Sequence, residues 1–149
     1  MVTTNTIKGE LNWATLVRAP IEQVYDAFAT GEGQDGWWTD GATIEAWPGG
    51  EVRFPWEEWG PDKLNDELVG KVIEVEKPTR FVFEWGAGPD FTTTVELTFE
   101  QREDGTVVRL HENGYPTDAA GLASMLGVSA GWGEALTLMK FYVEHGVRY

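Results

Sequence analysis

The sequence predicts an α+β domain in which an antiparallel sheet of six to seven strands is covered on one face by a long C-terminal helix. Between residues 42 and 113, apolar and polar side chains alternate as in β-strands, whereas residues 117–145 have the period of a helix. Strands and helices that are segregated along the chain are typical of α+β proteins. The length of 149 residues fits one domain, so we expect residues 1–149 to fold as one unit with a flexible segment at 1–10.

The first third of the chain predicts one strand, at residues 11–17, followed by two short helical segments. After Pro20, apolar residues recur at helical spacing: Ile21, Val24, Tyr25 and Phe28. Residues 31–36 match the G-x-G-x-x-G pattern, but they follow a helix rather than a strand, so they do not indicate a dinucleotide site. They predict instead a glycine-rich connection around a helical turn, which brings Trp37 and Trp38 into the core.

Six further segments have the pattern of antiparallel strands. They are residues 42–47, 51–56, 68–75, 80–85, 91–101 and 106–113. Residues 57–67 contain five acidic side chains and one lysine, and they are predicted to form a loop. Asp104-Gly105 is a strong signal for a two-residue hairpin turn. In the last helix, residues 127–133 predict a weak or kinked stretch, and an apolar stripe is expected to cover the sheet: Trp132, Leu136, Met139 and Val143.

The last hairpin predicts which side chains share a face. With Asp104 and Gly105 as the loop residues, Glu100 lies opposite Arg109 and Leu97 lies opposite Glu112. Glu112 then falls on the apolar face, where a carboxyl group is costly unless it is paired or hydrated. Two interpretations follow: the strand ends near residue 111 and leaves Glu112 solvated at the rim, or Glu112 is a polar group inside a ligand cavity.

Aromatic residues dominate the predicted inner positions, and the chain has eight tryptophans. We expect such a sheet, covered by one glycine-containing helix, to leave a pocket for a small apolar molecule. The alternative is a fully packed aromatic core. The expected ligand-binding residues are Trp38, Phe54, Trp56, Phe83, Trp85, Phe91, Phe99, Glu112, Trp132, Leu136 and Met139.

The composition argues against several classes of protein. A net charge of −14 disfavours nucleic-acid partners, and the lack of cysteine excludes disulfides and thiolate sites. The two histidines, His111 and His145, lack the spacing of metal ligands, so we expect no metal and no cofactor. No apolar run approaches the ~18 residues of a membrane span, and the N-terminus has no apolar leader, so we expect a cytoplasmic protein without membrane insertion.

The order and spacing of several motifs resemble a known superfamily. They are Ala19-Pro20-Ile21-Glu22 with Val24-Tyr25 and Ala27-Phe28, Trp37-Trp38, Gly49-Gly50-Glu51-Val52 with Phe54, Gly70-Lys71-Val72 with Glu74-Val75, Pro78 with Arg80-Phe81-Val82-Phe83 and Trp85, and Gly131-Trp132 with Leu136. Over residues 11–145 the chain is similar to the START-like (SRPBCC) superfamily, within it most to bacterial homologues of the C-terminal domain of the activator of the heat-shock protein 90 ATPase. The resemblance implies a helix-grip fold, a curved sheet wrapped around the C-terminal helix with a cavity between them.

The superfamily includes lipid and sterol carriers, hormone receptors, cyclases and co-chaperone domains, so the fold does not define one function. We expect a non-catalytic carrier or sensor of a small hydrophobic or aromatic molecule. One alternative is a co-chaperone-like module that binds a chaperone or another protein through an exposed patch around Trp47, Trp56 and Trp59. The other is a cyclase- or dehydratase-type enzyme in which Glu112 or Tyr115 transfers protons.

Overall fold

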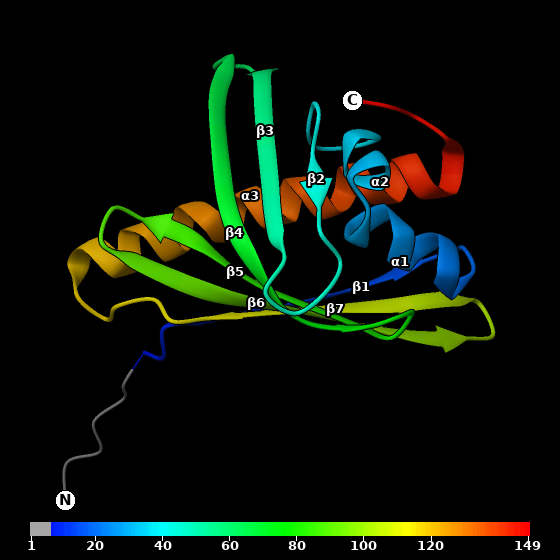
Figure 1. Ribbon diagram of the computed structural model, residues 1–149, viewed down its shortest axis with the longest axis horizontal. Helices are drawn as coiled ribbons and strands as arrows, with labels where there is room; N and C mark the ends of the chain where they lie inside the picture. The colour runs from blue at the N-terminus through cyan, green and yellow to red at the C-terminus, as the bar shows by residue number, and fades with distance from the viewer. Residues whose placement is uncertain (1–6) are drawn as a thin grey trace, which may run out of the picture.

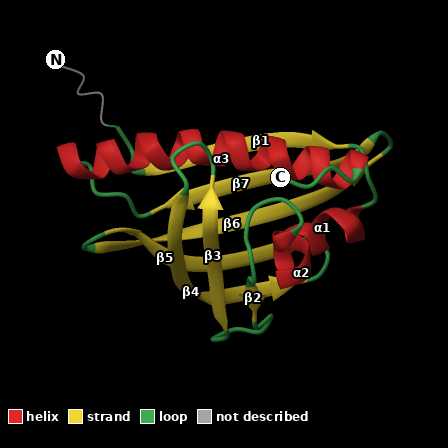
Figure 2. Cartoon of the chain, turned by 90° about the horizontal axis from the view of Figure 1, so that it is seen from above, coloured by secondary structure: helices red, strands yellow, loops and turns green. Residues whose placement is uncertain are grey.

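A seven-stranded antiparallel sheet and one long helix form the two main layers (Figures 1 and 2). The computed structural model describes residues 7–149. The strands are β1 (Glu10–Val17), β2 (Thr43–Ile44), β3 (Glu51–Trp59), β4 (Leu64–Glu76), β5 (Arg80–Gly88), β6 (Phe91–Arg102) and β7 (Gly105–Asn113), and the helices are α1 (Ile21–Ala29), α2 (Gly31–Asp35) and α3 (Ala119–His145). The strand order β1-β7-β6-β5-β4-β3-β2 and the helix across the sheet confirm the predicted α+β, helix-grip architecture.

The sheet curves around α3. Its register shifts at three places: between Trp56 and Trp59 in β3, between Val72 and Glu74 in β4, and between Gly86 and Gly88 in β5. Such irregularities bend a strand and increase its twist. In Figure 1, β3 and β4 consequently rise steeply past the helix, whereas β6, β7 and β1 run beneath it.

The C-terminal helix begins at a well-formed cap, because the Asp118 carboxylate accepts the Gly121 N–H at 2.8 Å. The predicted stripe of Trp132, Leu136, Met139 and Val143 is buried against the sheet. Residues 127–133, for which a weak or kinked stretch was predicted, lie inside one continuous helix of 27 residues. Contacts of the buried face hold the helix together where the glycines themselves would weaken it.

Two predicted boundaries are wrong. The strand expected at 42–47 is only the two residues of β2, because Trp47 already belongs to a turn that ends at Gly50. The loop expected at 57–67 is mostly strand, since β3 continues to Trp59 and β4 starts at Leu64. At the N-terminus, residues 1–6 of the predicted flexible segment lie outside the described residues. Strand β1 begins at Glu10, the last residue of that segment, which pairs with Asn113.

The last hairpin turns one residue earlier than predicted, and this shifts the cross-strand pairing by two residues. Arg102 pairs with Gly105, so Glu103 and Asp104 are the loop residues, and Val95 rather than Leu97 lies opposite Glu112. A shift of two residues keeps every side chain on its face. The apolar face therefore stands as predicted, whereas the proposed Glu100–Arg109 pair is wrong because Arg109 lies opposite Thr98.

Candidate functional site

A cavity of about 330 Å³ opens between one end of the sheet and the N-terminal half of α3. Strands β3, β4 and β5 form one wall, and the helix forms the other. Five of the eight tryptophans take part in its lining. The complete lining is Trp38, Trp56, Trp59, Leu64, Asp66, Leu68, Trp85, Gly86, Ala87, Val128, Gly131 and Trp132.

Trp38 lies at the centre of the aromatic cluster that bounds the cavity. It follows α2, whose first residues are capped by the Thr30 hydroxyl, and its ring stacks on the buried Trp37 with centroids 5.4 Å apart. From there it contacts Trp56 at 5.1 Å and Trp132 at 5.3 Å. Trp85 and Trp132 are neighbours at 5.5 Å, so rings from three separate parts of the chain form one continuous aromatic surface.

Two of these tryptophans are oriented by a buried carboxyl group. Glu112 on β7 is 0% exposed and accepts the Trp85 indole N–H at 3.0 Å and the Trp132 indole N–H at 2.8 Å. The Thr93 hydroxyl donates to the same group at 2.5 Å. Buried polar groups need such partners. Glu112 thereby ties β5, β6 and α3 to β7 and turns the polar edges of both indoles away from the cavity.

Tyr115 lies in the same buried polar region. Burial, followed by the negative charge of the nearby Glu112 carboxyl, raises the pKa of the Tyr115 phenol above its ordinary value of 10.0. Its hydroxyl has no hydrogen-bond partner among the described residues, and its ring packs edge-to-face on Phe91. The structure thus brings together the two residues considered for proton transfer, but neither lines the cavity.

The helix leaves room for the cavity through a missing side chain. At Gly131 an added Cβ would meet no atom within 4 Å, and the same is true of Gly127 one turn earlier. Gly131 lines the cavity, whereas Gly127 does not. Near its N-terminal end the helix is hydrogen-bonded to β5, because the Ser124 hydroxyl donates to the Ala87 carbonyl at 2.7 Å. The helix wall of the cavity is therefore anchored to β5.

The predicted ligand-binding residues divide into four groups. Trp38, Trp56, Trp85 and Trp132 line the cavity. Phe54 and Phe83 are fully buried beneath this cluster, and Glu112 lies behind it. Three others lie apart from the cavity: Phe99 and Met139 are in the core beside α1, and Phe91 packs on Tyr115. Leu136 faces a different hollow.

Sequence reasoning missed Trp59, Leu64 and Asp66, because all three fall in the segment that was predicted to be a loop. A signal was present, since Trp59 and Leu64 are the apolar positions of this acidic segment. The structure makes them cross-strand partners at the end of the β3–β4 hairpin. Of the proposed interaction patch, Trp47 is 57% exposed, but Trp56 is buried and Trp59 is only partly exposed.

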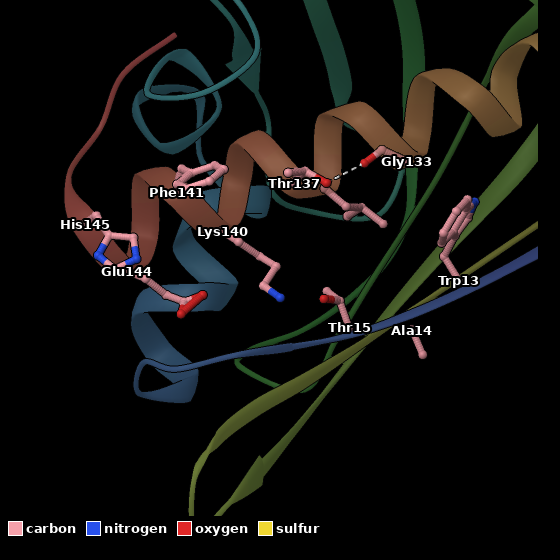
Figure 3. Close-up of a pocket in the computed structure, with 10 residues that line it drawn as sticks. Trp13, Ala14, Thr15, Gly133, Thr137, Lys140, Phe141, Glu144 and His145 are labelled. Atoms are coloured by element: carbon pink, nitrogen blue, oxygen red, sulfur yellow. Dashed lines mark hydrogen bonds between the residues drawn. The ribbon is translucent and has the colours of Figure 1, made fainter.

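A second hollow, of about 270 Å³, lies between β1 and the C-terminal half of α3 (Figure 3). Trp13, Ala14 and Thr15 lie on its strand side, and Lys140 and Glu144 reach toward them from the helix. This hollow carries both signs of charge and only one tryptophan, so it differs chemically from the tryptophan-lined cavity.

Within residues 7–149, no three His, Asp or Glu side chains are grouped as metal ligands would be. Over the same residues, no helix combines the length and the apolar character needed to cross a membrane.

A curved sheet that grips a long C-terminal helix, with a pocket between the two, defines a START-like protein. The family model for Activator of Hsp90 ATPase homolog 1-like proteins matches residues 18–144, and the chain belongs to this family. The match agrees with the resemblance seen in the sequence. A comparison with curated protein sequences gives no significant match.

Solved structures support the fold assignment. A protein from Staphylococcus saprophyticus is 28% identical with a TM-score of 0.76, over 94% of this chain and 95% of that one. The Aha1 dimer from Colwellia psychrerythraea is 21% identical with a TM-score of 0.74, over 92% and 97% of the two chains. CalU16 from Micromonospora echinospora is 19% identical with a TM-score of 0.72, over 90% and 73%. The last two likenesses concern the fold alone.

Proposed function

We propose that this protein binds a small hydrophobic or aromatic molecule in the tryptophan-lined cavity and acts as a carrier or sensor. The cavity itself is the observation that carries the proposal. Its volume of about 330 Å³ falls in the range of small-molecule sites, which are mostly apolar with a few polar groups. The resemblance to a superfamily that includes lipid and sterol carriers is consistent with it.

Binding without catalysis is favoured by the place of the carboxyl group. Glu112 is held by three donors and lies behind Trp85 and Trp132, so it acts on the rings rather than on a molecule in the cavity. An acid or base in catalysis needs to reach the proton that it transfers. We assign Glu112 a positioning role.

The test is a fluorescence titration with N-phenyl-1-naphthylamine, an uncharged probe whose emission rises in apolar surroundings. We expect saturable binding of one probe per chain. Gly131→Leu places a four-carbon side chain in the cavity and is expected to abolish this binding. Gly127→Leu is the matched control, because it makes the same change one turn away, outside the cavity lining.

The two variants also exclude a general effect on the helix, since both replace a helical glycine that has open space around it. Native-like circular dichroism and cooperative thermal unfolding establish that each variant folds. If Gly131→Leu binds the probe as well as Gly127→Leu does, or if the unmodified protein shows no saturable binding, the proposed function is wrong.

A further inference from the structure

We propose that the tryptophan-lined cavity selects organic cations, namely apolar or aromatic molecules that carry a quaternary or tertiary ammonium group. The inference rests on the proposed function, because it names the class of ligand for the same cavity. It follows from two properties of the lining: the part of each tryptophan that faces the ligand, and the sign of the charge beside it.

Trp85 and Trp132 offer a ligand π-electron surface rather than N–H donors. The indole N–H groups of Trp85 and Trp132 are both committed to Glu112, which lies outside the cavity lining. What these residues leave for a ligand is ring carbon. The face of an aromatic ring has negative potential and attracts a cation within about 6 Å of its centre, with tryptophan the strongest of the aromatic side chains.

The lining has one formal charge, and it is negative. Among the described residues around the cavity, Asp66 is the charged one, and no lysine, arginine or histidine joins it. Residues 57–67, which form this end of the β3–β4 hairpin, contain five acids against Lys63. An anion entering here would meet repulsion and no cationic partner, whereas a cation would be attracted from solution.

Asp66 and the rings act on the same space. Asp66 is the cross-strand partner of Trp56, and side chains of directly opposed residues lie on the same face, with Cβ atoms about 4.5–5.5 Å apart. Trp56 in turn contacts Trp38. A carboxylate and an aromatic surface therefore meet on one side of the cavity, which is the combination that recognises ammonium groups.

The experiment compares three probes with the same phenyl body and a tetrahedral head of different charge. They are phenyltrimethylammonium, the neutral tert-butylbenzene and the anionic benzenesulfonate. Calorimetric titration at low salt is expected to show phenyltrimethylammonium binding roughly five- to thirtyfold more tightly than tert-butylbenzene, with benzenesulfonate the weakest. Added salt should reduce the preference, because the charges are partly exposed.

Two variants identify the source of the preference. Asp66→Asn should lower the ratio of cation to neutral affinity about two- to fivefold and leave tert-butylbenzene unaffected. Glu67→Gln removes the same charge one residue away, on the opposite face of the sheet, where Glu67 pairs with Arg53. It should leave the ratio unchanged.

The outcomes separate this inference from the function on which it rests. Equal or tighter binding of tert-butylbenzene, or a ratio that Asp66→Asn does not change, overturns the cation preference while the N-phenyl-1-naphthylamine result still supports an apolar site. Failure of all three probes to bind also overturns the cation preference. The proposed function falls only with the naphthylamine titration and its Gly131→Leu variant.

Discussion

Two aromatic clusters lie between the sheet and α3: the cluster around Phe99, here called the filled end, is closely packed, whereas the cluster around Trp38, here called the open end, borders the tryptophan-lined cavity. At the filled end, Phe99 packs edge-to-face on Tyr25 and Phe28, and Met139 of the helix is fully buried beside them. At the open end, Trp38, Trp85 and Trp132 contact one another but border a cavity.

Different parts of the helix face the two clusters. The C-terminal half of α3 contributes Leu136, Met139 and Val143 to the core, and residues of α1 belong to the same core. The N-terminal half lines the cavity with Val128, Gly131 and Trp132, and Gly131 has no atom within 4 Å of where its Cβ would be. Aromatic content alone therefore does not decide whether a helix-grip core is packed or hollow.

Truncation at the filled end is expected to have the largest effect on stability. Phe99→Ala removes a ring that is enclosed on all sides, so the free energy of unfolding in urea should fall by about 3–5 kcal/mol. Trp56→Ala removes a larger ring, but one that borders a cavity and so has fewer contacts to lose. If Trp56→Ala destabilised the protein more than Phe99→Ala, the contrast between the ends would be wrong.

Loss of the Glu112 acceptor is expected to have the next largest effect on the free energy of unfolding. Glu112→Gln keeps the shape but replaces one acceptor oxygen with a donor that faces other donors, so unfolding should become easier by about 1–3 kcal/mol. Near-ultraviolet circular dichroism should also change, because Trp85 and Trp132 lose their fixed orientation. Glu100→Gln, on the exposed face of β6, is the control and should stay within about 0.5 kcal/mol of the parent protein.

Alkaline pH gives a smaller, graded effect through Tyr115. The unfolded phenol loses its proton near pH 10.0, whereas the raised pKa keeps the folded phenol protonated. Above pH 10.0 the unfolded state is therefore favoured, by up to about 1.4 kcal/mol per pH unit. Tyr115→Phe should flatten the decline in urea stability above pH 10 and leave stability near neutral pH almost unchanged. An equally steep decline in the variant would contradict the assignment. The pKa of Tyr25 is also raised, so part of the decline remains.

The smallest expected effects come from the helix glycines. Gly127→Ala and Gly131→Ala should each raise the free energy of unfolding by about 0.5–1 kcal/mol, because alanine favours the helix and both sites have space for a methyl group. Only Gly131→Ala should also weaken N-phenyl-1-naphthylamine binding. Equal weakening by both variants would mean that the cavity is not the binding site.

Much of the architecture could be predicted from the sequence, because alternation and helical period report directly on burial. The inner position of Glu112 is an instructive case. The predicted register was wrong by two residues, since Gly105 lies in β7 rather than in the turn, but an even shift preserves the faces. The prediction that Glu112 falls on the apolar face was therefore confirmed, although the register from which it was made was wrong. The alternative of a solvated rim residue is also wrong.

The cavity was harder to predict, for a physical reason. Periodicity shows that Trp85, Phe99 and Trp132 point inward, but it does not show which of them is enclosed and which borders a cavity. That depends on how the helix crosses the curved sheet, a tertiary property. The prediction for residues 57–67 was wrong for another reason. Adjacent acids such as Glu57-Glu58 and Asp66-Glu67 interrupt the alternation expected of a strand, so Trp59 and Leu64 were not recognised as paired strand positions.

The indole N–H signals of the eight tryptophans test the central claim most directly. In a two-dimensional ¹H–¹⁵N spectrum titrated with N-phenyl-1-naphthylamine, we expect saturable shifts for the tryptophans that line the cavity, which are Trp38, Trp56, Trp59, Trp85 and Trp132. The signals of Trp13, Trp37 and Trp47 should stay in place. Shifts centred on Trp13, beside the hollow between β1 and α3, or shifts of no tryptophan at all, would contradict the account.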